Sequence, residues 1–225
     1  MAKRRKKQQR KTNWLVIGVI VVGSILLLVG LTALAFQEPE QMDLGKYCQN
    51  NPENCVARGP ADAAVTIVEV SDYGCPHCKN YNLDTAPVLD AAYEGAPVRW
   101  AVLPFALPGQ TGDYPTMATA VAALCANEQG AFWQFHPAVF KLQDSPTLFN
   151  SREGWLQTAE SLGLDMEAFN NCLDNNNYEE VIRANIRAAQ NAGITATPSF
   201  SINGEILRGN QPVDMFQQRI DSFLN

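Results

Sequence analysis

The chain has 225 residues, of which 46% are hydrophobic and 18% are charged, so wholesale disorder and a multi-span membrane protein are both excluded. Its net charge of −6 is unevenly distributed. Seven of the 17 basic residues lie within residues 1–13, which leaves 10 basic against 23 acidic residues in the remainder, a net charge of −13. Such a body would repel a phosphate backbone, so the composition argues against a nucleic-acid partner.

An uncharged, apolar run at residues 14–36 follows the basic tail. As a helix it would be about 35 Å long, enough for the ~30 Å hydrocarbon core of a bilayer. All flanking cations precede it, so the positive-inside rule predicts a cytoplasmic tail at 1–13, a single-pass signal-anchor in the cell membrane and an extracytoplasmic remainder. Ala33-Leu34-Ala35 is typical of a cleavage site, so a signal peptide cleaved after Ala35 is the alternative. Both interpretations predict export.

The region after the apolar run begins with turn-forming sequence and then becomes strongly apolar. Residues 37–62 contain three prolines and two glycines and are expected to form a juxtamembrane linker. In residues 63–112, the β-branched run 64–70 predicts a buried strand, which is followed by a helix to about residue 93. A second strand is expected at 98–103, and strand, helix and strand together predict a parallel βαβ unit.

The C-terminal half begins with helical periodicity. Residues 113–192 are expected to form an inserted helical domain, ending at Gly193 as the residue after the last helix. In residues 193–225, Asn203-Gly204 lies between two short apolar runs and predicts a two-residue hairpin. A last helix is expected to begin after Pro212. The predicted order is therefore βαβ, a helical block, and ββα, an α/β class.

The chemistry is predicted to lie in the segment Cys75-Pro76-His77-Cys78, between the first strand and its helix. Cys75 would occupy the start of the helix, where free N–H groups and the helix dipole stabilise a thiolate. Cys78 would lie one turn further, within reach of a mixed disulfide at Cys75. Pro76 suits the first helical position, and His77 adds a donor or a positive charge near the sulfur.

Two other interpretations of this Cys-x-x-Cys segment are open. It could be half of a zinc site, but zinc takes four ligands and the sequence has no second pair at suitable spacing. No metal site is therefore predicted. The segment could also form a purely structural disulfide.

The sequence around these cysteines resembles a known family. The run from Val68 to Cys78 (VEVSDYGCPHC) is similar to the active-site segment of DsbA-like thiol–disulfide oxidoreductases, in particular their membrane-anchored, BdbD-type branch. Residues 193–204 (GITATPSFSING) resemble that family's cis-proline segment and hairpin, although Ala196 replaces a glycine common in relatives. The stretch 125–133 resembles its inserted helical domain. Over residues 59–224, the resemblance implies a thioredoxin fold with an inserted helical domain.

The resemblance also implies roles for individual residues. Cys75 would be the nucleophile and Cys78 the resolving thiol. Pro198 would be the cis-proline, and Thr197 would offer backbone hydrogen bonds to an extended substrate. Glu69 matches the family's buried acid, which would relay the proton of Cys78; an acid at a strand edge with no such role is the alternative.

The other cysteines are predicted to be structural. Cys125 and Cys172 lie on apolar faces of two predicted helices, so a disulfide between them would staple the helical block. Cys48 and Cys55 enclose a turn-forming segment and could form a second disulfide, although a free thiol or a pairing between chains is also open. His136 lies in an aromatic helix, where packing is favoured over chemistry.

Together these features predict a membrane-anchored, extracytoplasmic enzyme of dithiol–disulfide exchange, and an oxidase that acts on exported proteins with free thiols is the favoured expectation. No cofactor is expected beyond the redox-active Cys75–Cys78 disulfide. The family implies a quinone-linked membrane partner that reoxidises this pair. A reductase or isomerase would share every motif, and a non-catalytic binding module is a more remote alternative because both cysteines are present.

Overall fold

The computed structural model describes residues 14–35, 41–109, 113–175 and 178–224, which belong to two compact units divided after Glu40. The first unit contains helix α1, Trp14–Ala35. Side chains of α1 are described over residues 17–28. Among the residues whose side chains are described, no helix is long and apolar enough to cross a membrane. The basic tail at 1–13 lies outside the described residues.

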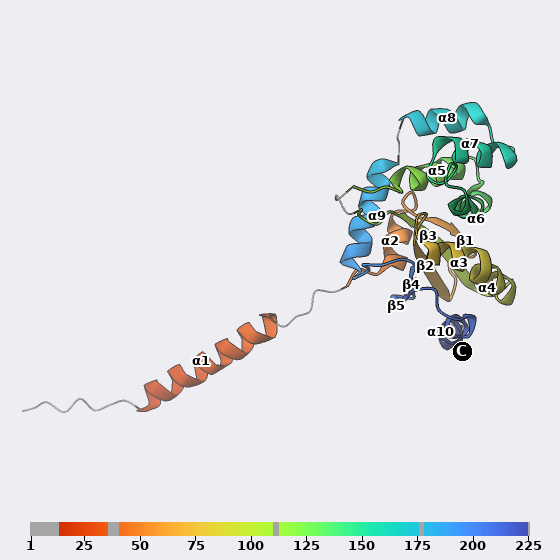
Figure 1. Ribbon diagram of the computed structural model, residues 1–225. Helices are drawn as coiled ribbons and strands as arrows, with labels where there is room; N and C mark the ends of the chain where they lie inside the picture. Colours follow the sequence, from red (N-terminus) through yellow and green to blue (C-terminus); the bar gives the residue numbers. More distant parts are fainter. Residues whose placement is uncertain (1–13, 36–40, 110–112, 176–177, 225) are drawn as a thin grey trace, which may run out of the picture. The chain divides into compact units, whose positions relative to one another are not determined.

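The second unit is built on a mixed five-stranded sheet (Figure 1). Its strands follow the order β1-β3-β2-β4-β5, in which β2 and β3 are parallel and every other pair is antiparallel. The strands are β1 Val56–Arg58, β2 Val65–Asp72, β3 Val98–Phe105, β4 Ser199–Ile202 and β5 Glu205–Arg208. The predicted βαβ unit and C-terminal hairpin are thereby confirmed.

Helices precede the sheet, connect its strands and follow them. The first group comprises α2 Leu44–Asn50, α3 Pro76–Asn80, the π-helical turn η1 Tyr81–Thr85 and α4 Ala86–Ala92. The group between β3 and β4 comprises α5 Met117–Glu128, α6 Phe132–Lys141, the 3₁₀ turn η2 Leu142–Asp144, α7 Arg152–Ser161, α8 Met166–Asn175 and α9 Glu179–Asn191. The last helix is α10, Val213–Leu224. Helices α5 to α8 gather at one end of the sheet and α10 lies toward the other (Figure 1).

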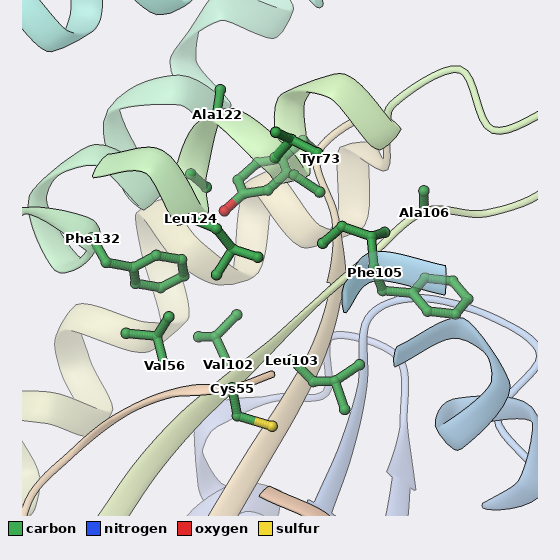
Figure 2. Close-up of a cluster of buried hydrophobic side chains, with 14 of the residues drawn as sticks. Cys55, Val56, Tyr73, Val102, Leu103, Phe105, Ala106, Ala122, Leu124 and Phe132 are labelled. Carbon is green, nitrogen blue, oxygen red and sulfur yellow. The ribbon is translucent and has the colours of Figure 1, made fainter. Parts of the chain in front are cut away.

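Side chains of the central strand β2 enter two hydrophobic clusters. Val65 and Ile67 pack in a cluster with Leu89 of α4 and Phe216 of α10. Val68 and Val70 belong to a larger cluster that continues into the helices between β3 and β4. Figure 2 shows part of it, with Cys55, Val56, Tyr73, Val102 and Phe132 among the labelled side chains. The sheet and the helical block therefore share the larger of the two clusters.

The helix predicted to run on to residue 93 is interrupted once. After α3 the chain makes the π-helical turn η1, and α4 then continues with Pro87 in its first turn. Proline has no N–H group to donate into the preceding turn, so a local change of hydrogen-bond pattern is expected beside it. Gly193, with φ of 72°, follows α9 as predicted.

The stretch predicted as a linker differs from that prediction. Within it, residues 41–62 contain α2 and β1, and β1 pairs antiparallel with β3. The Asp43 carboxylate caps α2 by accepting from the N–H groups of Gly45 and Lys46, and Leu44 is fully buried. A seven-residue helix and a three-residue strand are too short to produce a hydrophobic period, and this explains why the sequence pattern missed them.

The two expected structural disulfides are present. Cys48 of α2 is bonded to Cys55 beside β1, and Cys125 of α5 is bonded to Cys172 of α8. The second bond joins two helices of the block between β3 and β4. Cys75 and Cys78 remain as free thiols.

Candidate active site

The loop between β2 and α3 positions Cys75 at the start of the helix. Cys75 has extended backbone angles and immediately precedes α3, whose first residue is Pro76. Its N–H donates to the carbonyl of Asp72, and the Asp72 carboxylate accepts from the N–H groups of Gly74 and Leu107. A Cβ at Gly74 would lie 2.7 Å from the Thr116 methyl group, so this close approach requires glycine. The loop is thus fixed by its own sequence and by Leu107, which lies two residues after β3.

A segment of the helical block also holds this loop. The side-chain amide of Gln143, in η2, donates to the carbonyls of Tyr73 and Cys75 at 2.7 and 3.2 Å. The next residue, Asp144, forms an ion pair with Lys79 of α3. Gln143 is a site residue that the sequence analysis missed, because nothing in its local pattern indicates a partner 68 residues away.

The two thiols differ sharply in environment. Cys75 is half-buried, whereas Cys78 is fully buried. The Cys78 thiol, helped by the backbone N–H groups of Cys78 and His77, lowers the pKa of Cys75 to about 5, although partial burial opposes the shift. Burial raises the pKa of Cys78, and the neighbouring Cys75 and Glu69 raise it further. The arrangement therefore favours a thiolate at Cys75 and a protonated thiol at Cys78.

The other two residues of the segment are exposed. Pro76 and His77 both lie at the surface of the first turn. His77 acts on the Cys75 thiolate through its backbone N–H group. The role predicted for the His77 side chain remains a prediction.

The segment before β4 reaches the exposed side of the pair. The peptide bond between Thr197 and Pro198 is cis, and the carbonyl of Thr197 lies 3.3 Å from Cys75 Sγ, within hydrogen-bond reach of the thiol. Antiparallel pairing of β4 with β2 brings this segment to the loop. Thr197 and Pro198 are thus next to the candidate nucleophile, and their role in binding an extended substrate stays a prediction.

Glu69 lies in the interior of the protein. It is on β2, which is paired on both sides, and only 5% of its surface is exposed. The Asn82 side-chain amide donates to Glu69 Oε1 at 2.7 Å and to the Cys78 carbonyl at 3.0 Å, so it connects the acid to the helix that carries the thiol. Burial raises the pKa of Glu69 to about 7. A carboxyl group with this pKa can accept and return a proton near neutral pH.

Asn82 and His136 complete the buried side of the site. The sequence analysis missed Asn82, although its position four residues after Cys78 places it on the same helical face. His136 packs among aromatic rings, as expected, stacking on Phe132 with ring centroids 5.0 Å apart. Its Nε2 nevertheless lies 3.9 Å from a carboxylate oxygen of Glu69, so the structure brings it to the site.

Within the part of the chain that the structure describes, no three His, Cys, Asp or Glu side chains are arranged to hold a metal ion. The described site itself contains two thiols, one buried acid and backbone hydrogen-bond groups. Two neighbouring thiols of this kind can exchange with other thiols and disulfides.

Comparison with known proteins places this site in a family. A family model described as thioredoxin matches residues 51–222. The chain belongs to the thioredoxin family. It is 26% identical to a probable disulfide bond formation protein D of Bacillus anthracis, over 74% of this chain and 76% of that protein. The predicted resemblance to DsbA-like oxidoreductases of the BdbD type is thus confirmed.

Two further comparisons define the extent of this likeness. The crystal structure of oxidised BdbD from Bacillus subtilis superposes with a TM-score of 0.67 at 22% identity, covering 77% of this chain and 94% of that one, which supports the thioredoxin fold. The chain is also 30% identical, over 76% of its length, to Na(+)/H(+) antiporter NhaA 3 of Salinispora tropica. It spans a quarter of the length of that antiporter. The antiporter match therefore concerns a part of that protein, whereas the likeness to the disulfide bond formation protein D of Bacillus anthracis extends over most of its length.

Proposed function

We propose that this protein is an extracytoplasmic thiol–disulfide oxidase, which introduces disulfides into exported proteins through Cys75 and Cys78. The observation that carries the proposal is the asymmetry of the pair. Cys75 is partly accessible and has a pKa of about 5, whereas Cys78 is buried and its pKa is raised. An oxidant of this kind needs one thiolate that leaves easily and one thiol that resolves the intermediate.

The reaction begins with the Cys75–Cys78 disulfide. A substrate thiolate attacks Cys75 Sγ, so that a substrate–Cys75 bond forms, the Cys75–Cys78 bond breaks, and Cys78 departs with the electron pair and takes a proton. A second substrate thiolate then attacks the substrate sulfur of the mixed disulfide and releases Cys75 as a thiolate. The substrate dithiol is oxidised to a disulfide, and the enzyme pair is reduced. Glu69 is the proposed donor of the proton that Cys78 takes.

The low pKa of Cys75 supports the oxidising direction. At pH 7, a pKa of about 5 in place of the free value of ~8.5 stabilises the reduced form by up to ~2.7 kcal/mol. Solvent screening at a half-buried thiol reduces this to about 1–2 kcal/mol, which makes the couple about 20–40 mV more oxidising. The stabilisation applies above pH 5 and is lost as Cys75 becomes protonated in the reduced form.

We further propose that residues 14–36 anchor the enzyme in the cell membrane, with residues 1–13 in the cytoplasm. Support comes from the absence of charge in this run and from the basic residues on one side of it only. An anchored domain would act on proteins as they emerge from the membrane. Reoxidation of Cys75 and Cys78 would then be the task of a quinone-linked membrane protein.

The redox state of the pair in living cells tests the proposal. Cells would be quenched with acid, and free thiols labelled with an alkylating reagent that adds mass to each cysteine. An oxidase predicts that the pair is mostly oxidised, whereas a mostly reduced pair would indicate a reductase or isomerase. The control is a variant with Cys75→Ser and Cys78→Ser, whose labelling reports only the free thiols at Cys48, Cys55, Cys125 and Cys172. We expect these four cysteines to remain oxidised in it.

A further inference from the structure

A cavity of about 130 Å³ lies between β2, β3, η1 and α6. Glu69, Asn82 and His136 line its buried part. One water molecule needs about 10–15 Å³ of such a volume, so the cavity has room for several. Polar side chains at its buried end give those waters hydrogen-bond partners, as a hydrated cavity requires.

The cavity extends from Glu69 to the protein surface. Its outer lining includes Arg58, Asp90 and Trp133, which are partly or largely exposed. The Arg58 guanidinium lies 4.2 Å from the centre of the Trp133 ring and also pairs with the Asp90 carboxylate. Among the described residues, none from the Thr197–Pro198 segment lines the cavity. Glu69 therefore has a route to solvent separate from the place where a substrate would lie.

His136 presents one ring nitrogen to this cavity's acid. The other nitrogen, Nδ1, lies 2.7 Å from the Tyr73 hydroxyl oxygen. Among the described residues Nδ1 is the single hydrogen-bond partner of this hydroxyl, so the hydroxyl donates its hydrogen to Nδ1. Burial lowers the pKa of His136 to about 3, and the ring is neutral at pH 7. A neutral ring that accepts at Nδ1 carries its hydrogen on Nε2.

That Nε2–H group lies 3.9 Å from Glu69 Oε2, too far for a direct hydrogen bond. It is buried and has no hydrogen-bond partner among the described protein atoms. A buried donor of this kind is costly unless it is satisfied, and water can connect two polar groups at such a separation. The cavity beside both groups can supply that water.

We propose that His136 is a positioning residue for the proton of Glu69, acting through water held in this cavity. The inference rests on the proposed function and deepens it. The Nε2–H group donates to a water that in turn donates to the Glu69 carboxylate, which favours the ionised acid. When Glu69 gives its proton to the departing Cys78 thiolate, a proton from solvent replaces it through the cavity. When the pair is reoxidised, the proton of Cys78 leaves by the same route.

Other groups also influence this proton. Asn82 donates directly to Glu69, and the thiols of Cys75 and Cys78 belong to the same site. The titratable and charged groups around Glu69 are Arg58 of β1, Tyr73 of the loop after β2, Cys78 of α3, Tyr81 of η1, Asp90 of α4 and His136 of α6. Arg58 and Asp90 pair with each other at the cavity mouth, so their charges offset each other at Glu69.

The test is the titration of Glu69 in the reduced, detergent-solubilised full chain, followed by the infrared band of the protonated carboxyl group and assigned by its absence in Glu69→Gln. His136→Phe keeps an aromatic ring but removes both nitrogens, so we expect the pH of half-ionisation to rise by about one unit, a tenfold change in the ratio of the two forms. His136→Gln places an acceptor facing Tyr73 and an N–H facing Glu69, and should restore most of the wild-type titration.

Two further variants separate this role from packing. Phe140 is fully buried and contacts both His136 and Tyr73, so Phe140→Leu should lower stability without moving the Glu69 titration. Tyr73→Phe removes the hydrogen bond to His136 Nδ1 and should shift the Glu69 titration in the same direction as His136→Phe. This variant keeps the test available if His136→Phe does not fold. An unchanged titration in both His136→Phe and Tyr73→Phe, or an equal shift in His136→Gln and His136→Phe, would overturn the inference. Because the infrared readout needs no turnover, these outcomes are independent of whether the pair proves to be an oxidase.

Discussion

The site has two sides that differ in almost every physical property, although the residues that define them are three positions apart. On the outer side, Cys75 is half-buried, faces the cis-proline segment and is stabilised as a thiolate. On the inner side, Cys78 is fully buried beside Glu69 and is stabilised as a thiol. One turn of helix thus separates the thiol that we propose reacts with other proteins from the thiol that we propose resolves the mixed disulfide. Motif spacing provides both sulfurs, but tertiary packing gives them different chemistry.

Replacing each cysteine separately should have the largest effect. With Cys78→Ala the Cys75–Cys78 disulfide cannot form, so turnover should cease. The Cys75 thiolate can still attack a disulfide of a substrate and release one substrate thiolate, and without Cys78 to reverse this step the covalent Cys75–substrate adducts should accumulate. Cys75→Ala should give no adducts, because the remaining thiol is buried. Non-reducing electrophoresis of cells that express either variant makes the comparison. Equal adduct yields from the two variants would mean that the two sides are not distinct.

Removing the disulfides outside the site should affect stability and leave the chemistry intact. The Cys125–Cys172 bond joins residues 47 apart, so its loss should lower the free energy of unfolding by ~4 kcal/mol. The Cys48–Cys55 bond joins residues 7 apart and should contribute ~2.5 kcal/mol. Denaturant unfolding of the paired serine variants measures both. Thiol exchange by the folded fraction should be unchanged, and its loss would show that these bonds shape the site.

Glu69→Gln should stabilise the protein at alkaline pH. The folded-state pKa of Glu69 is raised to about 7 from 4.5, so the native state holds a proton that the unfolded state releases above pH 4.5. Stability therefore falls as pH rises from about 4.5 to 7, by ~3 kcal/mol in all. The glutamine variant should lack this decline and be more stable at pH 8 by a similar amount.

Unfolding in denaturant at pH 5 and pH 8 tests the effect of Glu69, with the exposed Glu167→Gln as the matched control. The same substitution should slow reoxidation, because Cys78 loses its proton acceptor. A Glu69→Gln variant with the wild-type pH dependence of stability would place Glu69 outside the inner side of the site.

His77→Ala should have the smallest effect. Its side chain is exposed, so solvent and salt screen any charge on it, and the backbone N–H group that stabilises the Cys75 thiolate is retained. We expect the pKa of Cys75 to rise by less than about half a unit. A rise of two units in the pKa of Cys75, measured by thiolate absorbance, would show that the His77 side chain has the larger role that the motif alone suggests.

The sequence predicts the outer side of the site better than the inner side. Cys75 and Pro198 of the outer side belong to local motifs, and the strand, helix and hairpin around them have clear periods. On the inner side, the motif identifies Cys78 alone. Glu69 could be assigned as a buried acid only through the family resemblance. His136 and Glu69 lie close together although they are far apart in the chain. Gln143, in the η2 turn after α6, likewise contacts the loop that carries Cys75. Such contacts depend on how the helical block packs, which no local period encodes.

The membrane-proximal part of the fold shows a similar limit. Residues 41–62 are rich in turn formers, yet Leu44 enters the core and Val56 pairs with Val102 of β3. Short elements such as α2 and β1 gain stability from tertiary contacts and a disulfide rather than from a hydrophobic period. Composition therefore predicted a linker where the chain contributes an edge strand.

The titration of the two thiols in the reduced wild-type protein tests the central claim most directly. The ultraviolet absorbance of the thiolate, followed from pH 3 to pH 9 with the Cys75→Ala variant as the baseline, should show one thiolate per chain appearing at about pH 5. No second thiolate should appear by pH 9, because Cys78 is buried and its pKa is raised. Two thiolates within this range, or a single one that appears near the free-cysteine value of ~8.5, would contradict the asymmetry on which the proposed oxidase rests.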